Sequence, residues 1–198
     1  PEFTRIEWQG YHAQSDGGSN WGVLRFGAHA EDDFEIFSVD ANTYIQANLK
    51  GKTLNVRKAG AKGDKVTDDT AAINKVKDYA QANVVARFNS GLTIKIPEGD
   101  FLISSTLEIT SSNIGLWGVD WSSSCLYAPD ADFDLVHFNG AALSLYSCSG
   151  GKLRLDTPGN ATAGAQLRTT RLIDSDFTGI RYVGHHIGLA CDSCARTF

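Results

Sequence analysis

The chain has 198 residues, of which 42% are hydrophobic, and it carries a formal net charge of −5 at pH 7. This charge gives no electrostatic reason to expect a nucleic-acid partner, and no stretch approaches the roughly 20 consecutive apolar residues of a membrane-spanning helix. We therefore expect neither nucleic-acid binding nor membrane insertion. Twenty glycines and four prolines suit frequent turns between short strands.

The first residues, Pro1-Glu2-Phe3, are typical of an expression-vector remnant, and the sequence contains no methionine. These features predict a segment cut from a longer polypeptide. Residues 4–55 then consist of short strand-like runs separated by Gly, Asp and Asn. Such runs predict a small β-rich N-terminal module.

Residues 56–73 read Val-Arg-Lys-Ala-Gly-Ala-Lys-Gly-Asp-Lys-Val-Thr-Asp-Asp-Thr-Ala-Ala-Ile, a short strand followed by a glycine turn and the start of a helix. Gly60 and Gly63 allow the backbone angles that a tight turn needs. Thr67 lies where a helix N-cap belongs. Apolar residues at helical spacing follow, so we predict a helix over about residues 67–82.

The aspartates of this segment, Asp64, Asp68 and Asp69, are interpreted as turn and cap residues rather than as catalytic acids. Asp68 and Asp69 would fall in the first helical turn, where carboxylates face the positive end of the helix dipole. The apolar side of such a helix needs a surface to cover. Laid across the open first coil of a solenoid, it would shield the interior and the unpaired strand edges.

Short strand candidates follow in quick succession from about residue 91. They are Thr93–Ile96, Phe101–Ile103, Leu107–Ile109, Ile114–Trp117, Cys125–Ala128, Leu135–Phe138, Leu143–Tyr146, Lys152–Leu155, Ala165–Arg168, Leu172–Phe177 and Gly188–Cys191. Comparable strands recur roughly every 16 to 24 residues, for example at Ile94, Leu116 and Val136. This spacing suits the coils of a β-helix, whereas a β-sandwich would not need the preceding helix.

Residues 56–73 resemble the start of the right-handed parallel β-helix in the pectate-lyase superfold, in the branch that holds bacteriophage tailspikes and related polysaccharide depolymerases. The usual form there is close to Val-x-x-Phe-Gly-Ala-x-Gly-Asp-Gly-x-Thr-Asp-Asp-Thr-x-Ala-Ile, so Ala59 replaces the common Phe and Lys65 the common Gly. Residues 10–18, Gly-Tyr-His-Ala-Gln-Ser-Asp-Gly-Gly, also resemble a segment that often precedes this β-helix. We therefore predict an all-β fold: a capped right-handed parallel β-helix over residues 56–198, preceded by the small module and truncated at the C-terminus.

The resemblance implies a homotrimeric tailspike of the phage virion, assembled in the host cytoplasm, that binds capsule or O-antigen polysaccharide at the bacterial surface and cleaves it. Cleavage in such proteins is usually glycoside hydrolysis and in some members β-elimination. The resemblance also implies attachment to a phage tail or baseplate protein through the N-terminal region, and no cofactor. Two alternatives stay open: a non-catalytic structural and receptor-binding trunk, and a secreted pectinase.

Residues 172–177 contain two aspartates, Asp174 and Asp176, that share the outer face of a strand if side chains alternate. Their carboxylates would lie about 6–7 Å apart along the strand, near the lower end of the roughly 6.5–9.5 Å separation of inverting glycosidases. Asp192 in the next coil would stack nearby, at about 4.8 Å. These three are the candidate catalytic residues. The alternative is that they are solvated or bind turn backbone.

Four residues are candidates for substrate binding: Trp117, Trp121, Tyr146 and Arg181. An exposed indole can stack on the C–H surface of a sugar, but aromatic side chains also fill cores and subunit contacts. The single Cys-x-x-Cys pair at residues 191–194 lacks the second ligand pair of a four-cysteine zinc site. We therefore expect no metal. The resemblance to phage tail proteins, which fold in a reducing cytoplasm, implies free thiols.

Overall fold

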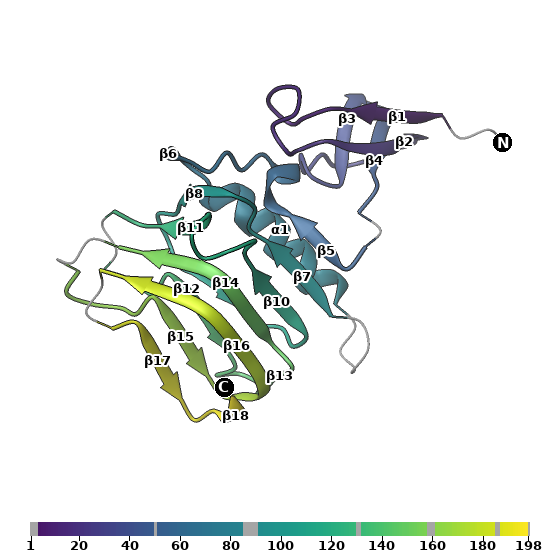
Figure 1. Ribbon diagram of the computed structural model, residues 1–198. Coiled ribbons are helices and arrows are strands. Elements are labelled where there is room, and N and C mark those ends of the chain that lie inside the picture. The colour runs from purple at the N-terminus through teal and green to yellow at the C-terminus, as the bar shows by residue number, and fades with distance from the viewer. Residues whose placement is uncertain are drawn as a thin grey trace.

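The computed structural model of the chain describes residues 4–49, 51–84, 91–129, 132–157, 161–184 and 187–197. An antiparallel sheet comes first, and a solenoid of parallel strands follows, with helix α1 (Thr70–Asn83) beside its first strands (Figure 1). Within the described ranges, no helix is long and apolar enough to cross a membrane.

The N-terminal sheet has the strand order β1-β2-β4-β3, and each neighbouring pair is antiparallel. Its strands are β1 Arg5–Trp8, β2 Asn20–Phe26, β3 Ile36–Asp40 and β4 Thr43–Ala47. Phe34, just before β3, is buried and packs edge-on against Tyr79 of α1, with ring centroids 5.5 Å apart. The ring Nε2 of His12 lies 2.7 Å from the carbonyl oxygen of Gly60. These contacts join the N-terminal sheet to the solenoid.

Two parallel sheets form most of the solenoid, with strand orders β5-β7-β10-β14-β11-β8-β6 and β17-β15-β12-β9. Its elements are β5 Thr53–Asn55, the 3-10 turn η1 Val56–Ala59, β6 Asp64–Asp68, β7 Leu92–Lys95, β8 Gly99–Leu102, β9 Leu107–Ile109, β10 Ile114–Trp117, β11 Ser124–Tyr127, β12 Val136–Asn139, β13 Leu145–Tyr146, β14 Ser149–Asp156, β15 Leu167–Thr170, β16 Leu172–Val183, β17 Leu189–Asp192 and β18 Ala195–Thr197. The first half of β14 pairs with β10 and its second half with β11. Strand β16 pairs along both halves of β14 and continues the pattern into the next coil.

The predicted parallel β-helix is confirmed, and each predicted strand overlaps an observed one between β7 and β17. Ile94 and Leu116 pair in register, as their spacing predicted. Val136 is not the next member of that line, because it pairs with Leu107 and Leu167 in the other sheet. The coils therefore differ in length more than the sequence period indicated.

Stacked apolar side chains fill the interior of the coils. One line consists of Phe101, Leu126 and Leu155, which are in register and almost completely buried. Each such side chain stabilises the fold by about 1.5–3 kcal/mol relative to leaving it exposed. The alternation that turns these residues inward turns their neighbours outward.

Helix α1 begins at Thr70, with Asp69 as its N-cap residue, and the prediction that Thr67 is the N-cap is wrong. The carboxylate of Asp64 accepts hydrogen bonds from the backbone N–H and the hydroxyl of Thr67, at 2.7 and 2.9 Å. These bonds hold Thr67 in a turn. Lys65 adopts a left-handed conformation, φ 66, at the position where the tailspike pattern usually has glycine.

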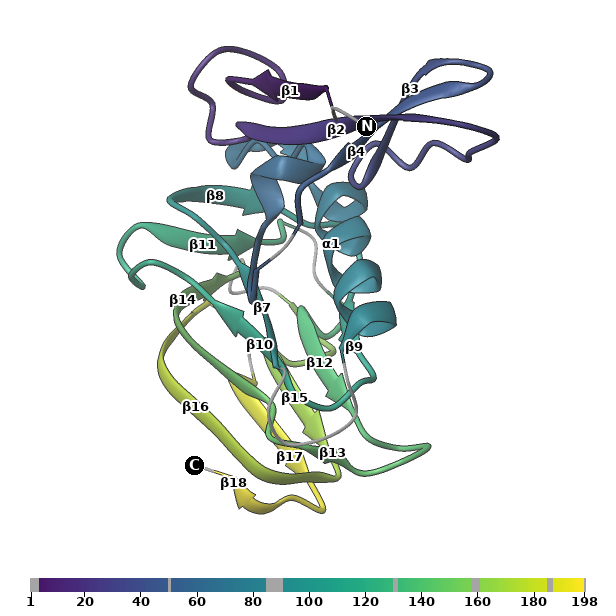
Figure 2. The ribbon, with the colours of Figure 1, turned by 90° about the vertical axis from the view of Figure 1, so that its right-hand side faces the viewer.

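The buried face of α1 is formed by Ile73, Val76 and Ala80. It packs on η1 and on strands β5, β7 and β9, and Figure 2 shows the helix running along this end of the solenoid. The predicted role of the helix, to cover the first coil, is confirmed. An uncovered coil would expose apolar interior and strand edges.

Replacing Asp69 with alanine is expected to lower the free energy of unfolding by about 2–3 kcal/mol. The Asp69 side chain is buried, and its two oxygens accept hydrogen bonds from the backbone N–H groups of Lys62 and Gly63, at 2.7 and 2.9 Å. Truncation leaves both groups of the glycine turn without these acceptors. Urea unfolding measures the loss. The control is Asp78→Ala on the exposed side of α1, and equal unfolding midpoints for the two variants would contradict the expectation.

Candidate functional site

Charged side chains from successive coils meet on the outer face of the large parallel sheet. Asp100 of β8, Cys125 of β11, Arg154 of β14 and Arg181 of β16 occupy paired positions in register. The residues that follow the first three of them in sequence are buried in the interior line. Strand alternation therefore points this line outward.

Arg154 lies between two carboxylates. Its Nη2 is 2.7 Å from Oδ1 of Asp100, and its Nε is 3.6 Å from Oδ2 of Asp156. One guanidinium therefore contacts both carboxylates and holds them on the same side of the sheet. Cys125 is buried beside Arg154, and burial raises the pKa of its thiol to about 12. The thiol therefore stays protonated, and the carboxylates are the groups that can carry acid–base chemistry.

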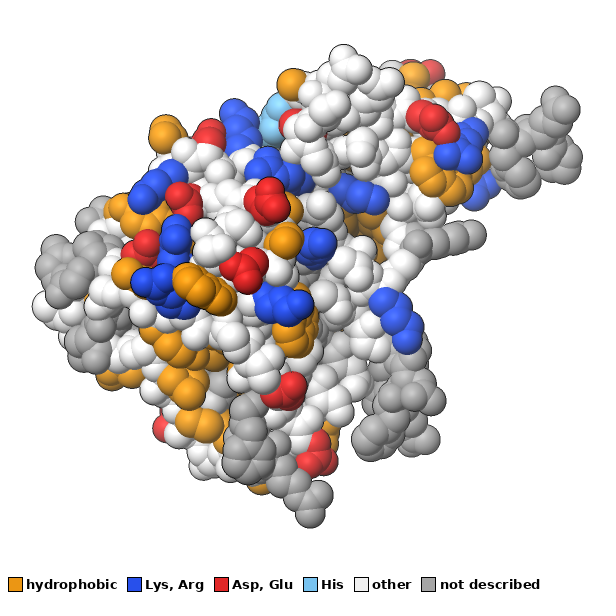
Figure 3. Space-filling view, in the orientation of Figure 1, with side chains coloured by type: hydrophobic (Ala, Val, Ile, Leu, Met, Phe, Trp, Pro, Cys, Tyr) orange, Lys and Arg blue, Asp and Glu red, His pale blue; other side chains and the backbone are white. Residues whose placement is uncertain are grey.

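Aromatic rings lie beside this charged line. The indole of Trp121 is 42% exposed, and the guanidinium carbon of Arg181 lies 4.8 Å from its centroid. The ammonium of Lys65 lies 4.6 Å from the ring of Tyr127, which is in register with Asp156. Figure 3 shows hydrophobic, basic and acidic side chains gathered over β8, β11 and β14. We call this surface the front face and define it as Asp100, Trp117, Trp121, Tyr127, Arg154, Asp156 and Arg181.

Trp117 completes the front face on the other side of a bend in the sheet. Its indole Nε1 donates to Oγ of Ser149 at 3.1 Å. The ring lies across Gly151, where an added Cβ would come within 2.9 Å of it. Lys152 and Gly179 form the bend, since both have positive φ and lie between the paired residues on either side. The glycine thus makes room for the indole, and the left-handed residues turn the sheet between Trp117 and Arg154.

The structure brings three of the predicted substrate-binding residues, Trp117, Trp121 and Arg181, to the front face. The fourth, Tyr146, lies on β13 at a corner of the coil and is 44% exposed. It pairs with Ile173 and is not part of the front face. Its role in substrate binding stays a prediction.

Asp174 and Asp176 do not lie on one uninterrupted strand face. Asp176 is exposed and in register with Ser149, the residue that binds the Trp117 indole. Asp174 has a φ of 49° and forms a corner, stacked on Ser147, which has a φ of 54° at the same place in the preceding coil. Both aspartates are exposed and Ser175 between them is buried, as predicted, but the left-handed corner interrupts the strand at Asp174. The catalytic role of the two residues stays a prediction, but the 6–7 Å spacing does not apply across a corner.

Asp192 belongs to the second sheet, where β17 places it in register with Thr170. Its Oδ2 lies 3.4 Å from Nη1 of Arg168. The predicted stacking of Asp192 near Asp174 is wrong, because the strand next to Ile173 in the following coil begins at Ala195. Asp192 and the front face thus lie on different sheets.

A second charged line runs along the outer face of that sheet, with Glu108, His137 and Arg168 in register. Nε2 of His137 is 3.0 Å from the hydroxyl of Thr170, and its Nδ1 is 4.0 Å from Oε1 of Glu108. Partial burial lowers the pKa of His137 below its usual range, against the opposing effect of nearby carboxylates. Nε of Arg168 contacts Oδ2 of Asp134 at 2.6 Å. We call Glu108, His137 and Arg168 the second-sheet line.

The sequence interpretation missed Asp100, Arg154 and Asp156. One signal was available: in Lys152-Leu153-Arg154-Leu155-Asp156 the alternation places Arg154 and Asp156 on the same side. The position of Asp100 needed the coil length, because this residue comes from two strands away. Among the described residues, no group of three or more His, Cys, Asp or Glu side chains is arranged to hold a metal ion.

Comparisons with known proteins agree with this architecture. Residues 53–132 match the family model described as rhamnogalacturonase A/epimerase, pectate lyase-like. A probable glucan endo-1,3-beta-glucosidase of Arthroderma benhamiae is 41% identical over 70 residues, which is 35% of this chain and 7% of the fungal protein.

Two solved phage structures share the fold. Tailspike protein gp49 of Acinetobacter baumannii bacteriophage Fri1, a capsular polysaccharide depolymerase, matches with a TM-score of 0.64 at 13% identity, over 98% of this chain and 40% of that one. ORF18 of Geobacillus virus E2 matches with a TM-score of 0.62 at 20% identity, over 79% of this chain and 34% of that one. The pectate-lyase-like resemblance is therefore confirmed, and the chain shares its fold with these two phage proteins. The chain spans well under half the length of each of these proteins.

Proposed function

We propose that this chain is the first part of the β-helix of a phage tailspike that binds a bacterial surface polysaccharide along the front face and hydrolyses it. The proposal rests on one observation. The Trp121 indole, in cation–π contact with Arg181, lies on the same outer face as Arg154, which contacts both Asp100 and Asp156. Two matched proteins, a capsular polysaccharide depolymerase and a probable glucan endo-1,3-beta-glucosidase, support the substrate class.

The carboxylate pair would supply acid and base for hydrolysis. One carboxylic acid protonates the oxygen of the leaving sugar, and the other carboxylate removes a proton from the attacking water. The C–O bond of the glycoside breaks, the water oxygen bonds to the anomeric carbon, and a new reducing end results. Arg154 would hold Asp100 and Asp156 in position, and Trp121 would offer its ring face to a sugar.

The proposal also places the two parts of this chain within a complete tailspike. Residues 56–198 would form the start of the β-helix, and residues 4–55 would be a linking module on the side of the tail or baseplate. The complete tailspike would be a homotrimer of the virion, assembled in the host cytoplasm and acting on capsule or O-antigen at the bacterial surface. The fold shared with Fri1 gp49 supports this placement.

A second candidate reaction, β-elimination, is favoured by the second-sheet line. The lowered pKa of His137 keeps its ring neutral near pH 7, so it can accept a proton. Arg168, in the next coil, could face the carboxylate of a uronate, although Asp134 and Asp192 already contact its guanidinium. This reaction would leave an unsaturated sugar, which absorbs ultraviolet light, instead of a saturated product.

Trp121→Ala is expected to weaken polysaccharide binding about tenfold, because it removes the ring that Arg181 supports. Isothermal titration with purified capsules and O-antigens measures the affinity. Tyr146→Ala tests the other predicted binding residue, since this exposed ring lies at a corner outside the front face. Weaker binding by Tyr146→Ala with unchanged binding by Trp121→Ala would contradict the proposed site.

Binding without cleavage, in this chain and in the longer protein, would favour the non-catalytic trunk.

A further inference from the structure

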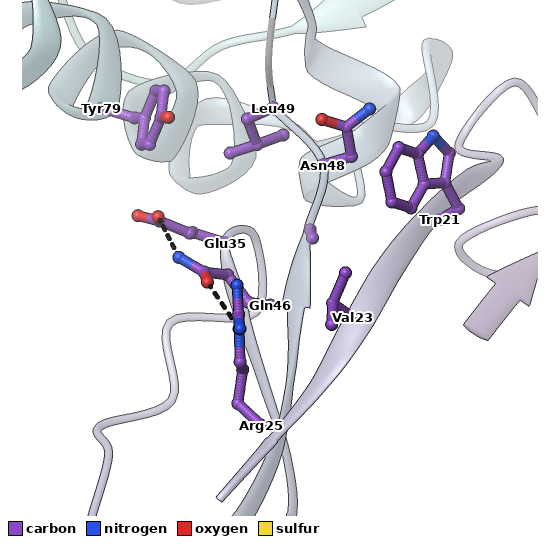
Figure 4. A pocket seen from close by; sticks show the side chains of 9 residues that line it. Trp21, Val23, Arg25, Glu35, Gln46, Asn48, Leu49 and Tyr79 are labelled. Carbon is purple, nitrogen blue, oxygen red and sulfur yellow. Dashed lines mark hydrogen bonds between the residues drawn. The ribbon is translucent and has the colours of Figure 1, made fainter. Parts of the chain in front are cut away.

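We infer that a second saccharide site lies between the N-terminal sheet and helix α1, and that it takes one neutral pyranose unit. A cavity of about 260 Å³ opens there, and Figure 4 shows side chains from β2, β4 and α1 converging on it. Sites for drug-sized ligands begin near 300 Å³, so this one suits a single small ring. The residues that carry the inference are Trp21, Arg25, Glu35, Gln46, Asn48 and Tyr79.

A row of polar groups forms one wall of the cavity. Trp21, Val23 and Arg25 alternate along β2 and therefore face the same side, and Gln46 of β4 is in register with Val23. Nε of Arg25 donates to Oε1 of Gln46 at 3.3 Å, and Nε2 of Gln46 donates to Oε1 of Glu35 at 3.4 Å (Figure 4). A guanidinium, an amide and a carboxylate thus lie side by side along this wall.

This row selects the chemistry of the ligand. The charges of Arg25 and Glu35 are opposite, so the wall as a whole favours a neutral molecule over an ion. Neighbouring sugar hydroxyls both donate and accept hydrogen bonds, which matches a wall that offers donors and acceptors side by side. Asn48 also lines the cavity.

Aromatic side chains supply the apolar part of the site. The indole of Trp21 lines the cavity, and the guanidinium of Arg5 lies 4.5 Å from its centroid. Tyr79 approaches from α1, opposite the sheet (Figure 4). Burial and then the nearby carboxylates of Glu35 and Asp32 raise the pKa of Tyr79, so its phenol keeps its proton. Flat rings next to paired polar groups suit the C–H and O–H surfaces of a pyranose.

A second hollow shares two lining residues with this cavity. This open hollow, about 810 Å³, shares Trp21 and Asn48 with the cavity and is lined further by Trp8, Asn20 and Lys58. None of these residues belongs to the front face, so the inference goes beyond the proposed function and does not depend on it.

The test follows the Trp21 indole N–H signal by NMR during titration with methyl glycosides of glucose, galactose and mannose. We expect a saturable shift with at least one glycoside, with a millimolar dissociation constant. Glu35→Gln keeps the size of the side chain but removes the charge, and it should weaken this affinity about tenfold. Trp121→Ala, on the front face, should leave it unchanged. The absence of a saturable Trp21 shift up to about 50 mM glycoside would overturn the inference.

Arg25→Lys is the second variant, in case Glu35→Gln unfolds. It should also weaken binding, because an ammonium cannot reproduce the planar donor of the guanidinium. Full affinity in the folded variants, or a shift at the front-face indoles with none at Trp21, would overturn the site. Failure of the front face appears elsewhere, in the polysaccharide titration of Trp121→Ala, so the two results are distinguishable.

Discussion

Gly63→Ala is expected to destabilise the folded chain by about 2–4 kcal/mol. Gly63 has a φ of 65°, a left-handed conformation that alanine adopts only with strain. A Cβ at this position would also lie 2.7 Å from Cζ of Phe101, a ring with no exposed surface in the first coil. The ring cannot withdraw without opening the core, so strain and overpacking add to one another.

Urea unfolding followed by circular dichroism measures this loss. Gly51→Ala is the matched control, because no described atom lies within 4 Å of an added Cβ there. The control should unfold at the midpoint of the original chain, and Gly63→Ala at a clearly lower urea concentration. Coincident unfolding curves for the two variants would show that the glycine turn does not depend on the left-handed residue.

Asp156→Asn and Asp100→Asn are each expected to lower polysaccharide hydrolysis by about 10²- to 10⁴-fold while leaving polysaccharide binding largely intact. Each substitution keeps the shape of the side chain and removes the proton-transfer group next to Arg154. Initial rates of reducing-end release by the longer protein measure the effect. Circular dichroism shows whether each variant still folds.

The same hydrolysis assay decides whether the acid pair lies on the front face or at Asp174 and Asp176, the residues predicted from sequence. Asp174→Asn and Asp176→Asn are measured in the same assay, with Asp78→Asn on α1 as the control for a general effect of charge. Full activity of Asp100→Asn and Asp156→Asn, together with inactivity of Asp174→Asn and Asp176→Asn, would move the acid pair to the corner of β16.

The parts of the fold that local sequence could predict are those that need only neighbouring residues. Strands β9 and β10 are bounded by turn residues and match their predicted ranges. The apolar spacing of Ile73, Val76 and Ala80 predicted the buried face of α1. The start of the helix was wrong because the Asp64 carboxylate captures Thr67 in a turn, and a capping pattern cannot reveal that competition.

The parts that failed depend on coil register. Leu107, Val136, Leu167 and Leu189 follow one another in adjacent strands of the second sheet, but unequal numbers of residues separate them. The expected coil spacing of roughly 16 to 24 residues therefore placed Asp192 beside Asp174 instead of beside Thr170. The left-handed corner at Asp174 was also hidden, because aspartate adopts this conformation only in particular contexts. The contact between Asp100 and Arg154 was missed because it also depends on the lengths of the coils between them.

Polysaccharide turnover, followed by reducing-end release and by ultraviolet absorbance of unsaturated products, separates hydrolysis at the front face from β-elimination. The substrates are a panel of bacterial capsules and O-antigens, and this chain is assayed beside the longer protein. We expect at least one substrate to yield reducing ends without ultraviolet absorbance, and Asp100→Asn and Asp156→Asn each to lower the release by about 10²- to 10⁴-fold. Unsaturated products that disappear on His137→Ala, or cleavage that survives both front-face substitutions, would contradict hydrolysis at the front face.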